Sequence, residues 1–385
     1  MSAPDRLFDD IDRVYDGPRR YTEPVFDYIN HSARPEYLKI RKLLEEWFTR
    51  YPRKEREELK NRLRSGDGGF YSAFFELYLY NLLFQLGFEI EIHPFKSGKK
   101  SRIDFKVSKD KKPVFYLEAK VVMPSKEKIS SQVRENQIYD SINKHLESPY
   151  FFIGLEILKS SSTSPSGRKI SKFLEKKLSL LNYEKVVKKY KQHGLDSLPR
   201  WLYEDMDWQI IFFPIPKKPE EKEKTNIRPI GTVLYEGVYL NLAKKIKNAI
   251  RDKSTKYGEM DLPYIVAINV WDSNLVCDEE DIELALFGIS PPYEVETYKG
   301  KLDGVWYGPE GPRNRRISAI WVTVNLDHWR IAQIPPLVWC NPWAEKPLKL
   351  DYVTFIKFFD LKDEFVKIGK IDACKLLGLD PKWPC

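Results

Sequence analysis

The chain has 385 residues, of which 42% are hydrophobic and 14% are aromatic, so it can bury a large core. The formal net charge of +8 is a mild excess that suits a polyanionic partner without requiring one. The four cysteines are far apart and form no Cys-x-x-Cys pair, which argues against a zinc site of that type and against a disulfide framework. This cysteine pattern fits a reducing cytoplasm.

The N-terminal segment favours neither a signal peptide nor a membrane anchor. Its sequence "MSAPDRLFDDIDRVYDGPRR" is charged throughout. No stretch of the chain approaches the roughly 20 apolar residues that cross a membrane. We therefore expect a cytoplasmic protein without a membrane partner. Residues 1–36 predict an irregular arm, and residues 36–65 predict a helix that is broken near Pro52.

Residues 66–158 predict a helix, three strands, a helix and a strand. "GDGG" (66–69) indicates a turn before a helix, because the Gly-Lys-Ser/Thr of a phosphate loop does not follow. "FYSAFFELYLYNLLFQLGF" (70–88) is apolar nearly all round, which predicts a helix packed on both sides and ending at Gly87. The next elements are the strand-like runs "FEIEIHPF" (88–95), "RIDFKV" (102–107) and "PVFYLEAKVV" (113–122), an amphipathic helix (126–148) and a buried strand (150–158).

The later sequence predicts further helices and strands after a Ser-rich loop. They are basic helices over about 168–192 and 238–257, strands over 208–216, 264–270 and 317–326, and an acidic helix over 278–287. We divide the chain into an N-terminal arm and helical segment (1–66), a core (67–160), and an α+β extension or second domain (161–385). Whether the extension continues the core sheet is open, and we expect it to supply specificity rather than chemistry.

Two carboxylates and an amine are predicted to meet on neighbouring strands. Alternation in "RIDFKV" places Asp104 on the face opposite to Ile103 and Phe105. Glu118 and Lys120 are two residues apart, so they share one face of the next strand. An antiparallel pairing brings Asp104 beside them. Mg²⁺ prefers such hard oxygen ligands, and it can acidify a bound water and neutralise charge on a phosphodiester.

The same residues resemble the PD-(D/E)XK nuclease superfamily. That signature has an acid on one strand, an acid-x-Lys on the next strand and a Glu on the preceding helix. Here these are Asp104, Glu118-Ala119-Lys120 and Glu76, whereas Ile103 replaces the proline of the name. The predicted order over 70–158 also matches the αβββαβ core of the family. The resemblance implies an α/β fold, with a mixed sheet flanked by helices and a restriction-endonuclease-like core.

The resemblance also implies a function and a set of site residues. The chain is expected to be a Mg²⁺-dependent nuclease, with Mn²⁺ as a substitute, that hydrolyses phosphodiester bonds, with DNA favoured. Oligomerisation is left open. The expected metal ligands are Asp104, Glu118 and Glu76, and Lys120 and Gln132 complete the catalytic set. The expected nucleic-acid contacts are basic residues before the second strand and in the loop "GPRNRR", namely Lys99, Lys100, Arg102, Arg313, Arg315 and Arg316.

Two other interpretations stay open. The chain could be a catalytically inactive nucleic-acid-binding or scaffold module on a nuclease-like fold. It could also be a structural protein in which Asp104, Glu118 and Lys120 form a solvated, salt-bridged sheet face. Glu76 argues against the second interpretation, because it lies among apolar helix residues and a buried carboxylate needs a partner. We expect that partner to be Lys120 or a metal-bound water. Gln132 fits an exposed helix position better than a position in the site.

Overall fold

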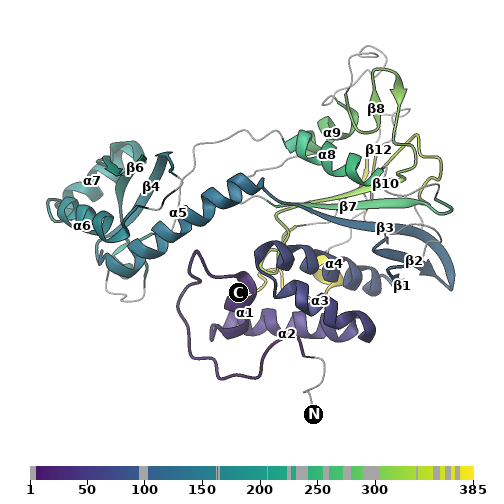
Figure 1. Cartoon of the computed structure of the whole chain (residues 1–385), viewed down its shortest axis with the longest axis horizontal. Helices are drawn as coiled ribbons and strands as arrows, with labels where there is room; N and C mark the ends of the chain where they lie inside the picture. The colour runs from purple at the N-terminus through teal and green to yellow at the C-terminus, as the bar shows by residue number, and fades with distance from the viewer. Residues whose placement is uncertain are drawn as a thin grey trace. The chain divides into compact units, whose positions relative to one another are not determined.

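The structure is a computed structural model, and the chain divides into two compact units (Figure 1). The first unit comprises residues 1–16, 24–123 and 240–385, and the second comprises residues 17–23 and 124–239. The residues described are 6–94, 103–161, 163, 165–205, 207–222, 227–230, 242–254, 260–271, 279–288, 303–334, 337–349, 356–359, 366–368 and 373–385.

The first unit begins with a helical layer. Its helices are α1 (Val25–His31), α2 (Pro35–Arg50), the 3-10 turn η1 (Arg53–Glu55), α3 (Arg56–Leu63) and α4 (Asp67–Gln85). The break predicted near Pro52 is confirmed. So is the all-round burial of α4, which ends two residues before Gly87, a glycine with φ of +76°. The prediction of an irregular arm over residues 1–36 missed α1, a short helix that packs in the same apolar core as α4.

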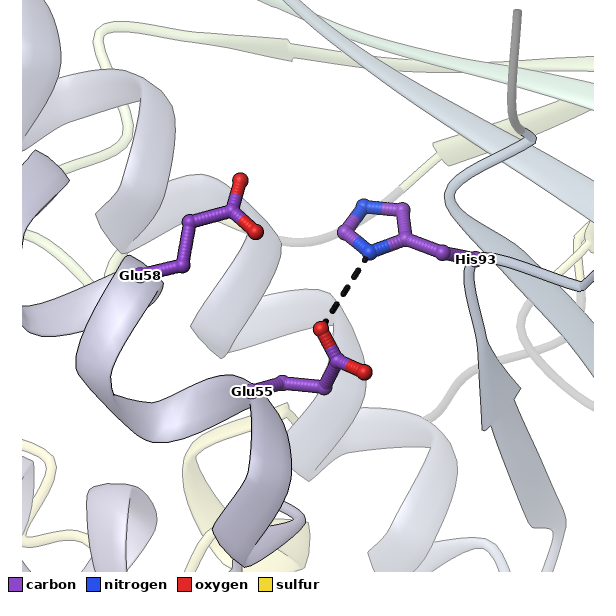
Figure 2. Close-up of side chains that lie close together, drawn as sticks. All are labelled: Glu55, Glu58 and His93. Atoms are coloured by element: carbon purple, nitrogen blue, oxygen red, sulfur yellow. Dashed lines mark ion pairs between the residues drawn. The ribbon is translucent and has the colours of Figure 1, made fainter.

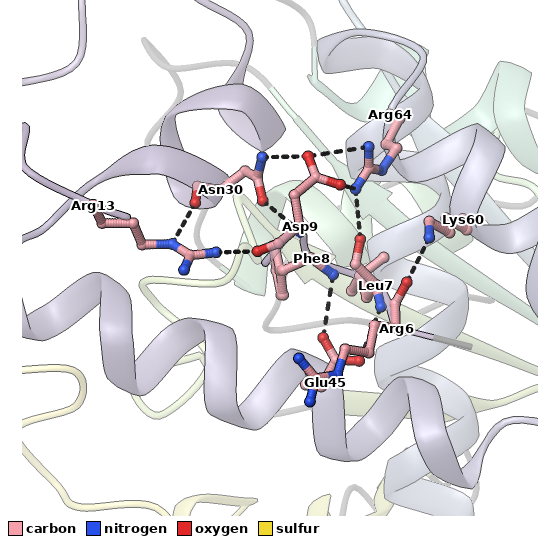
Figure 3. A network of polar contacts seen from close by, with 9 residues as sticks. All are labelled: Arg6, Leu7, Phe8, Asp9, Arg13, Asn30, Glu45, Lys60 and Arg64. Carbon is pink, nitrogen blue, oxygen red and sulfur yellow. Dashed lines mark hydrogen bonds and ion pairs between the residues drawn. The ribbon is translucent and has the colours of Figure 1, made fainter. Parts of the chain in front are cut away.

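Polar contacts hold the segment before α1 against this helical layer (Figure 3). The backbone N–H groups of Leu7 and Phe8 both donate to the Glu45 carboxylate of α2, at 2.9 and 3.2 Å. The Arg64 guanidinium donates to the Asp9 carboxylate at 2.7 Å. Residues 7–9 are therefore a bound strap and not a free arm.

One mixed eight-stranded sheet forms the centre of the first unit. Its order is β1 (Glu89–Ile92), β2 (Phe105–Lys109), β3 (Lys112–Val122), β7 (Tyr264–Val270), β10 (Ala319–Val324), β11 (Leu337–Cys340), β12 (Ile356–Phe359) and β13 (Val366–Ile368). Strands β1, β2 and β3 are antiparallel neighbours, whereas β3, β7 and β10 run parallel. A two-stranded ribbon, β8 (Tyr307–Gly308) with β9 (Gly311–Pro312), and α10 (Ala373–Leu376) complete the unit.

Helices cover both faces of this sheet (Figure 1). On one face, Leu117 and Ile265 pack in the core that contains α4, and we call this the α4 face. On the other face, Val266 and Ile268 pack against α8 (Leu242–Ser254) and α9 (Glu279–Phe287), and we call this the α8 face. Burial on both sides explains why the β7 run "YIVAINV" is continuously apolar except for Asn269.

The second unit has its own sheet and core. Its antiparallel strands lie in the order β4 (Phe151–Lys159), β6 (Trp208–Pro216) and β5 (Trp201–Asp205). Its helices are α5 (Lys126–His145), α6 (Gly167–Leu178) and α7 (Tyr183–His193), with 3-10 turns η2 (Leu195–Ser197) and η3 (Pro219–Glu221). Apolar residues of α5, α6 and all three strands form its core. The segment 17–23 joins this unit through the Asp140 carboxylate, which accepts from the N–H groups of Tyr21 and Thr22.

The structure confirms a mixed α/β sheet flanked by helices but changes the boundaries of the predicted core. Residues 67–160 do not form one sheet, because β4 pairs with β6 in the second unit. The strand beside β3 is β7 instead. The predicted extension 161–385 is therefore divided: part lies in the second unit, and part continues the first sheet. Local patterns indicated both β4 and β7 as buried strands, but they carry no information about which strand pairs with β3.

Two smaller differences concern the second unit. The basic helix predicted over 168–192 is two helices, and the Asn182 side chain accepts from the Lys185 N–H to begin the second one. Strand β5 was not predicted. Within the described parts of the chain, no helix has the length and apolar character that crossing a membrane requires.

Candidate functional site

The candidate site lies beside the first residue of β2, where β3 extends beyond its pairing with β2. Phe105 pairs with Leu117, and beyond this point, among the described residues, Glu118–Val122 pair only with β7. Asp104 directly precedes β2, and its Oδ2 accepts a hydrogen bond from the Ala119 N–H at 2.7 Å. The carboxylate of Asp104 thus occupies the edge of β3 at the point where the neighbouring strand has ended.

Glu118 and Lys120 lie on the same face of β3, as alternation predicts. Their neighbours Leu117 and Val121 pack in the core on the α4 face, so Glu118 and Lys120 belong to the α8 face. The Glu118 side chain is 1% exposed and forms an ion pair with Lys253 of α8. Lys120 is half-buried and makes no ion pair within the described part of the chain.

Glu76 is buried in α4 and is already paired. Its side chain is 5% exposed, and its carboxylate accepts from the Tyr51 hydroxyl at 2.6 Å and from the Arg62 guanidinium at 2.5 Å. The expectation that Glu76 needs a partner is thus met, but by Tyr51 and Arg62 instead of Lys120 or a metal-bound water. Helix α3 therefore supports this buried carboxylate.

The surroundings of Asp104 disfavour the ionised form of its side chain. Burial, the nearby charge of Glu118 and then that of Glu76 raise the pKa of Asp104 from 3.8 to about 7, although the Ala119 N–H opposes the shift. Two carboxylates that repel one another in a poorly solvated place favour either a shared proton or a cation. The donor set of Asp104 and Glu118 therefore fits a hard divalent cation such as Mg²⁺, which often takes only one or two protein carboxylates.

The three predicted metal ligands do not form one compact group in this conformation. Among the described residues, one set of three potential ligands has its ligand atoms within 4.8 Å of one another, and it consists of Glu55, Glu58 and His93. Glu76 contributes charge near Asp104 and is held by Arg62, so it is placed as a supporting residue and not as a ligand.

Gln132 does not belong to the helix that packs beside β3 and β7. It lies on α5 of the second unit, and its side-chain amide donates to the Asn136 side chain at 3.1 Å. The helix that covers β3 on the face of Glu118 and Lys120 is α8, which the sequence reasoning did not connect to the site. Lys253 follows Ile246 and Ile250 at helical spacing, so it continues the apolar stripe of α8. A cation at the end of such a stripe is the signal that could have identified Lys253.

The expected nucleic-acid contacts have different outcomes. Lys99, Lys100 and Arg102 lie outside the described residues. Arg313 is used within its own loop, where its guanidinium donates to the Gly304 carbonyl and pairs with Asp303 at 2.5 Å. The Arg315 Nε donates to the Trp343 carbonyl at 3.2 Å, and Arg316 is exposed. Arg315 and Arg316 therefore remain candidates for phosphate contacts.

No family model, no curated protein and no solved structure matches the chain. The function is therefore inferred from the side chains and the topology of the chain itself.

Proposed function

We propose that this chain is a metal-dependent nuclease of the PD-(D/E)XK type that hydrolyses phosphodiester bonds, with DNA as the favoured substrate. One observation carries the proposal: Asp104 lies close enough to Glu118 for the charge of Glu118 to raise the pKa of Asp104, at the point where β2 and β3 separate. Lys120 shares the face of Glu118, so an ammonium accompanies the two acids.

The order of elements supports this proposal. Helix α4, strands β1, β2 and β3, helix α8 and strand β7 follow the αβββαβ order of that family, and β1, β2, β3 and β7 are consecutive neighbours in the sheet. Residues 124–239 come between β3 and α8 and form most of the second unit. On this interpretation the second unit is an insertion in a restriction-endonuclease-like core, and α8 and β7 replace the predicted α5 and β4.

Each site residue has a role in the proposed reaction. Asp104 and Glu118 would hold Mg²⁺ or Mn²⁺, which supplies an acidified water and neutralises charge on the phosphodiester. Lys120 would orient the attacking water or stabilise the charge that develops on phosphorus oxygens. Lys253 neutralises Glu118 in the metal-free protein. A cation at Glu118 would release this ammonium to contact a substrate phosphate.

The ion pairs of the site favour a second candidate function, an inactive nucleic-acid-binding module. Arg62 already balances Glu76, and Lys253 already balances Glu118. Such compensation lets the acidic cluster persist without any metal, as a nuclease fold that has lost catalysis would require. Binding of nucleic acid without cleavage is the behaviour expected of this alternative.

The two functions are separated by a cleavage panel. Linear, circular and single-stranded DNA and RNA would be incubated with the full chain in Mg²⁺, in Mn²⁺ and in EDTA. We expect metal-dependent cleavage that falls by orders of magnitude in Asp104→Asn, a change that keeps the acceptor for the Ala119 N–H. Asp110→Asn is the matched control, because Asp110 is exposed in the β2–β3 turn.

Cleavage by the parent chain that persists undiminished in Asp104→Asn would refute the metal-nuclease proposal. Salt-sensitive binding without cleavage in any metal would support the inactive module. If the chain neither binds nor cleaves any substrate of the panel, both functions are wrong.

A further inference from the structure

A second group of potential metal ligands lies at the junction of the helical layer and the sheet edge (Figure 2). Glu55 ends η1, Glu58 lies in the first turn of α3, and His93 directly follows β1. Because Glu55 and Glu58 are three residues apart at a helix start, their side chains can reach the same side. Figure 2 shows both carboxylates directed toward the imidazole of His93. The ligand atoms of all three residues lie within 4.8 Å of one another.

The imidazole of His93 has an unused ligand atom in this group. Its Nδ1 is buried and has no hydrogen-bond partner among the described residues, and the side chain is 16% exposed. The Nδ1 lies 3.6 Å from the Glu55 Oε2, which is too long for a hydrogen bond. Two ligands that each lie about 2.1 Å from one ion in tetrahedral geometry are about 3.4 Å apart. The gap between His93 and Glu55 is therefore the size that a shared metal ion spans.

We propose that Glu55, Glu58 and His93 form a divalent transition-metal site that is separate from the acids of the candidate active site. An imidazole with two carboxylates favours Zn²⁺ or Mn²⁺ over Mg²⁺, which prefers oxygen ligands alone. Three protein ligands leave at least one coordination position for water. This inference does not depend on the proposed nuclease function.

Solvent and ions can reach this site from the helical layer. Glu58 is exposed and borders an open hollow of about 620 Å³. The hollow is lined by Lys54, Glu57, Glu58, Asn61, Arg62 and Ser65. The competing arrangement is a simple ion pair between Glu55 and a protonated His93, with Lys54 at 3.9 Å from the other Glu55 oxygen. Because the Lys54 side chain is 77% exposed, its attraction is weak and a metal ion can displace it.

A bound ion would join α3 to the end of β1. The backbone N–H of His93 donates to the Asp104 carbonyl at 2.9 Å, so the main chain at His93 is anchored beside β2. Arg62, one turn after Glu58 on α3, holds the Glu76 carboxylate. The ion would thus fix the helix that supports Glu76. Because the ligands converge only in the folded chain, such an ion raises thermal stability by mass action.

The test is metal binding by the full chain carrying Asp104→Asn, which weakens any contribution from the candidate active site. Zn²⁺, Mn²⁺ and Mg²⁺ are titrated by calorimetry, Co²⁺ by its visible absorption, and melting is recorded with and without Zn²⁺. The variants are His93→Asn, Glu58→Gln and the control Glu57→Gln. Asn is chosen because it tolerates the φ of +50° at His93, and Glu57 is an exposed neighbour on the same turn.

We expect one equivalent of Zn²⁺ or Mn²⁺ to bind, with a rise in the melting temperature. The affinity should fall by more than about 10-fold in His93→Asn and in Glu58→Gln, and it should be unchanged in Glu57→Gln. Equal affinity in all four proteins would overturn the proposal. Mg²⁺ binding that is as tight as Zn²⁺ binding would also overturn it. Since Glu58 is exposed, Glu58→Gln keeps the test valid if His93→Asn fails to fold, and neither result depends on nuclease activity.

Discussion

At the scale of single residues, the candidate site is held together by opposed charges. The pKa of Asp104 is raised because this half-buried carboxyl is desolvated and lies near the charge of Glu118, whereas Glu118 and Glu76 each have a cationic partner. In the metal-free chain, therefore, the ionisation of Asp104 is disfavoured. The stability of the fold should therefore depend on pH. Lys253, which pairs with Glu118, should also affect stability more than Lys120 does.

The first prediction concerns stability against pH in EDTA. The pKa of Asp104 is about 7 in the folded chain and 3.8 when unperturbed, so the folded chain binds more protons between these values. Stability should then fall as pH rises from about 4 to 7, and the full cost persists above pH 7. Asp104→Asn removes this cost, which is at most about 4 kcal/mol for a shift of about three units. Urea unfolding at pH 4, 6 and 8 should show the variant more stable than the parent at pH 8.

The control for this prediction is Asp110→Asn, which changes an exposed Asp on the adjacent turn. Its unfolding should follow the parent at every pH. If Asp104→Asn were less stable than the parent at pH 8, the carboxylate would be stabilising the fold, and the raised pKa would be wrong.

The second prediction separates Lys120 from Lys253. Lys253→Ala removes the ammonium that forms an ion pair with the Glu118 carboxylate, a side chain that is 1% exposed. Removing one partner of a buried pair costs about 3 kcal/mol or more, so the metal-free variant should melt well below the parent and recover partly in Mg²⁺. Lys120→Ala should melt like the parent and still bind metal, but it should lose cleavage. A similar melting temperature for both variants would show that the Lys253 pair carries no stability.

The residue pattern predicted some of this site and missed the rest for a physical reason. Strand alternation was enough to place Glu118 and Lys120 on one face. The partners of Glu76 could not be read from the pattern, because Tyr51 and Arg62 are 25 and 14 residues away along the chain. The packing of α3 and of the end of α2 against α4 brings them together. Buried charge predicts that a partner exists, whereas its identity is a property of the tertiary structure.

At the scale of elements, the strap at residues 7–9 ties the chain start to α2. The Glu45 carboxylate accepts from two backbone N–H groups, those of Leu7 and Phe8, and both of these residues are buried. The Glu45 carboxylate thus binds the strap, although Glu45 itself belongs to α2. Leu7 and Phe8 of the strap belong to the same apolar core as α4.

The third prediction is that Glu45→Ala destabilises the first unit. Two buried donors lose their acceptor, and each unsatisfied donor costs about 1–3 kcal/mol, less where water can enter. Glu46→Ala is the matched control, because Glu46 is exposed on the same helix and, among the described residues, forms an ion pair with Arg50 alone. Thermal melts of the two variants should differ by several degrees. Equal melting temperatures would mean that the strap does not contribute to folding stability.

The sequence patterns predicted which segments are helices and strands, but they did not predict which strands pair in the sheet. The periodic patterns gave α4, α8, β6 and β7 close to their observed bounds. They could not show that β3 pairs with β7, because 124–239 separates the two strands in the chain. A parallel pair always needs a crossover connection, and nothing in a local pattern limits its length. If each predicted strand is paired with the next one in the chain, an inserted unit of this size cannot be detected.

At the scale of the whole molecule, positive charge is concentrated in the second unit. Between residues 161 and 200 there are ten Lys and Arg residues and three Asp and Glu residues, and this excess is close to the net charge of +8 for the entire chain. Helices α6 and α7 bury Ile170, Leu174 and Val186 and leave most of their lysines exposed. Exposed basic residues of this kind are where a phosphate backbone would make contact if the chain binds nucleic acid as proposed.

The fourth prediction is that these lysines carry a large part of nucleic-acid affinity but none of the chemistry. Lys188→Gln/Lys189→Gln removes two exposed charges from α7, and Lys39→Gln/Lys42→Gln removes two from α2, so both variants have the same net charge. If the α7 lysines contact phosphates, only the first variant should bind DNA more weakly, with a slope of log K against log salt that is shallower by up to about 2. Fluorescence anisotropy across a salt series measures this slope. Cleavage at saturating DNA should be unchanged, because Asp104, Glu118 and Lys120 all lie in the first unit. Equal slopes in the two variants would assign DNA binding to net charge alone, and the exposed lysines of α7 would then be an ordinary solvated helix face.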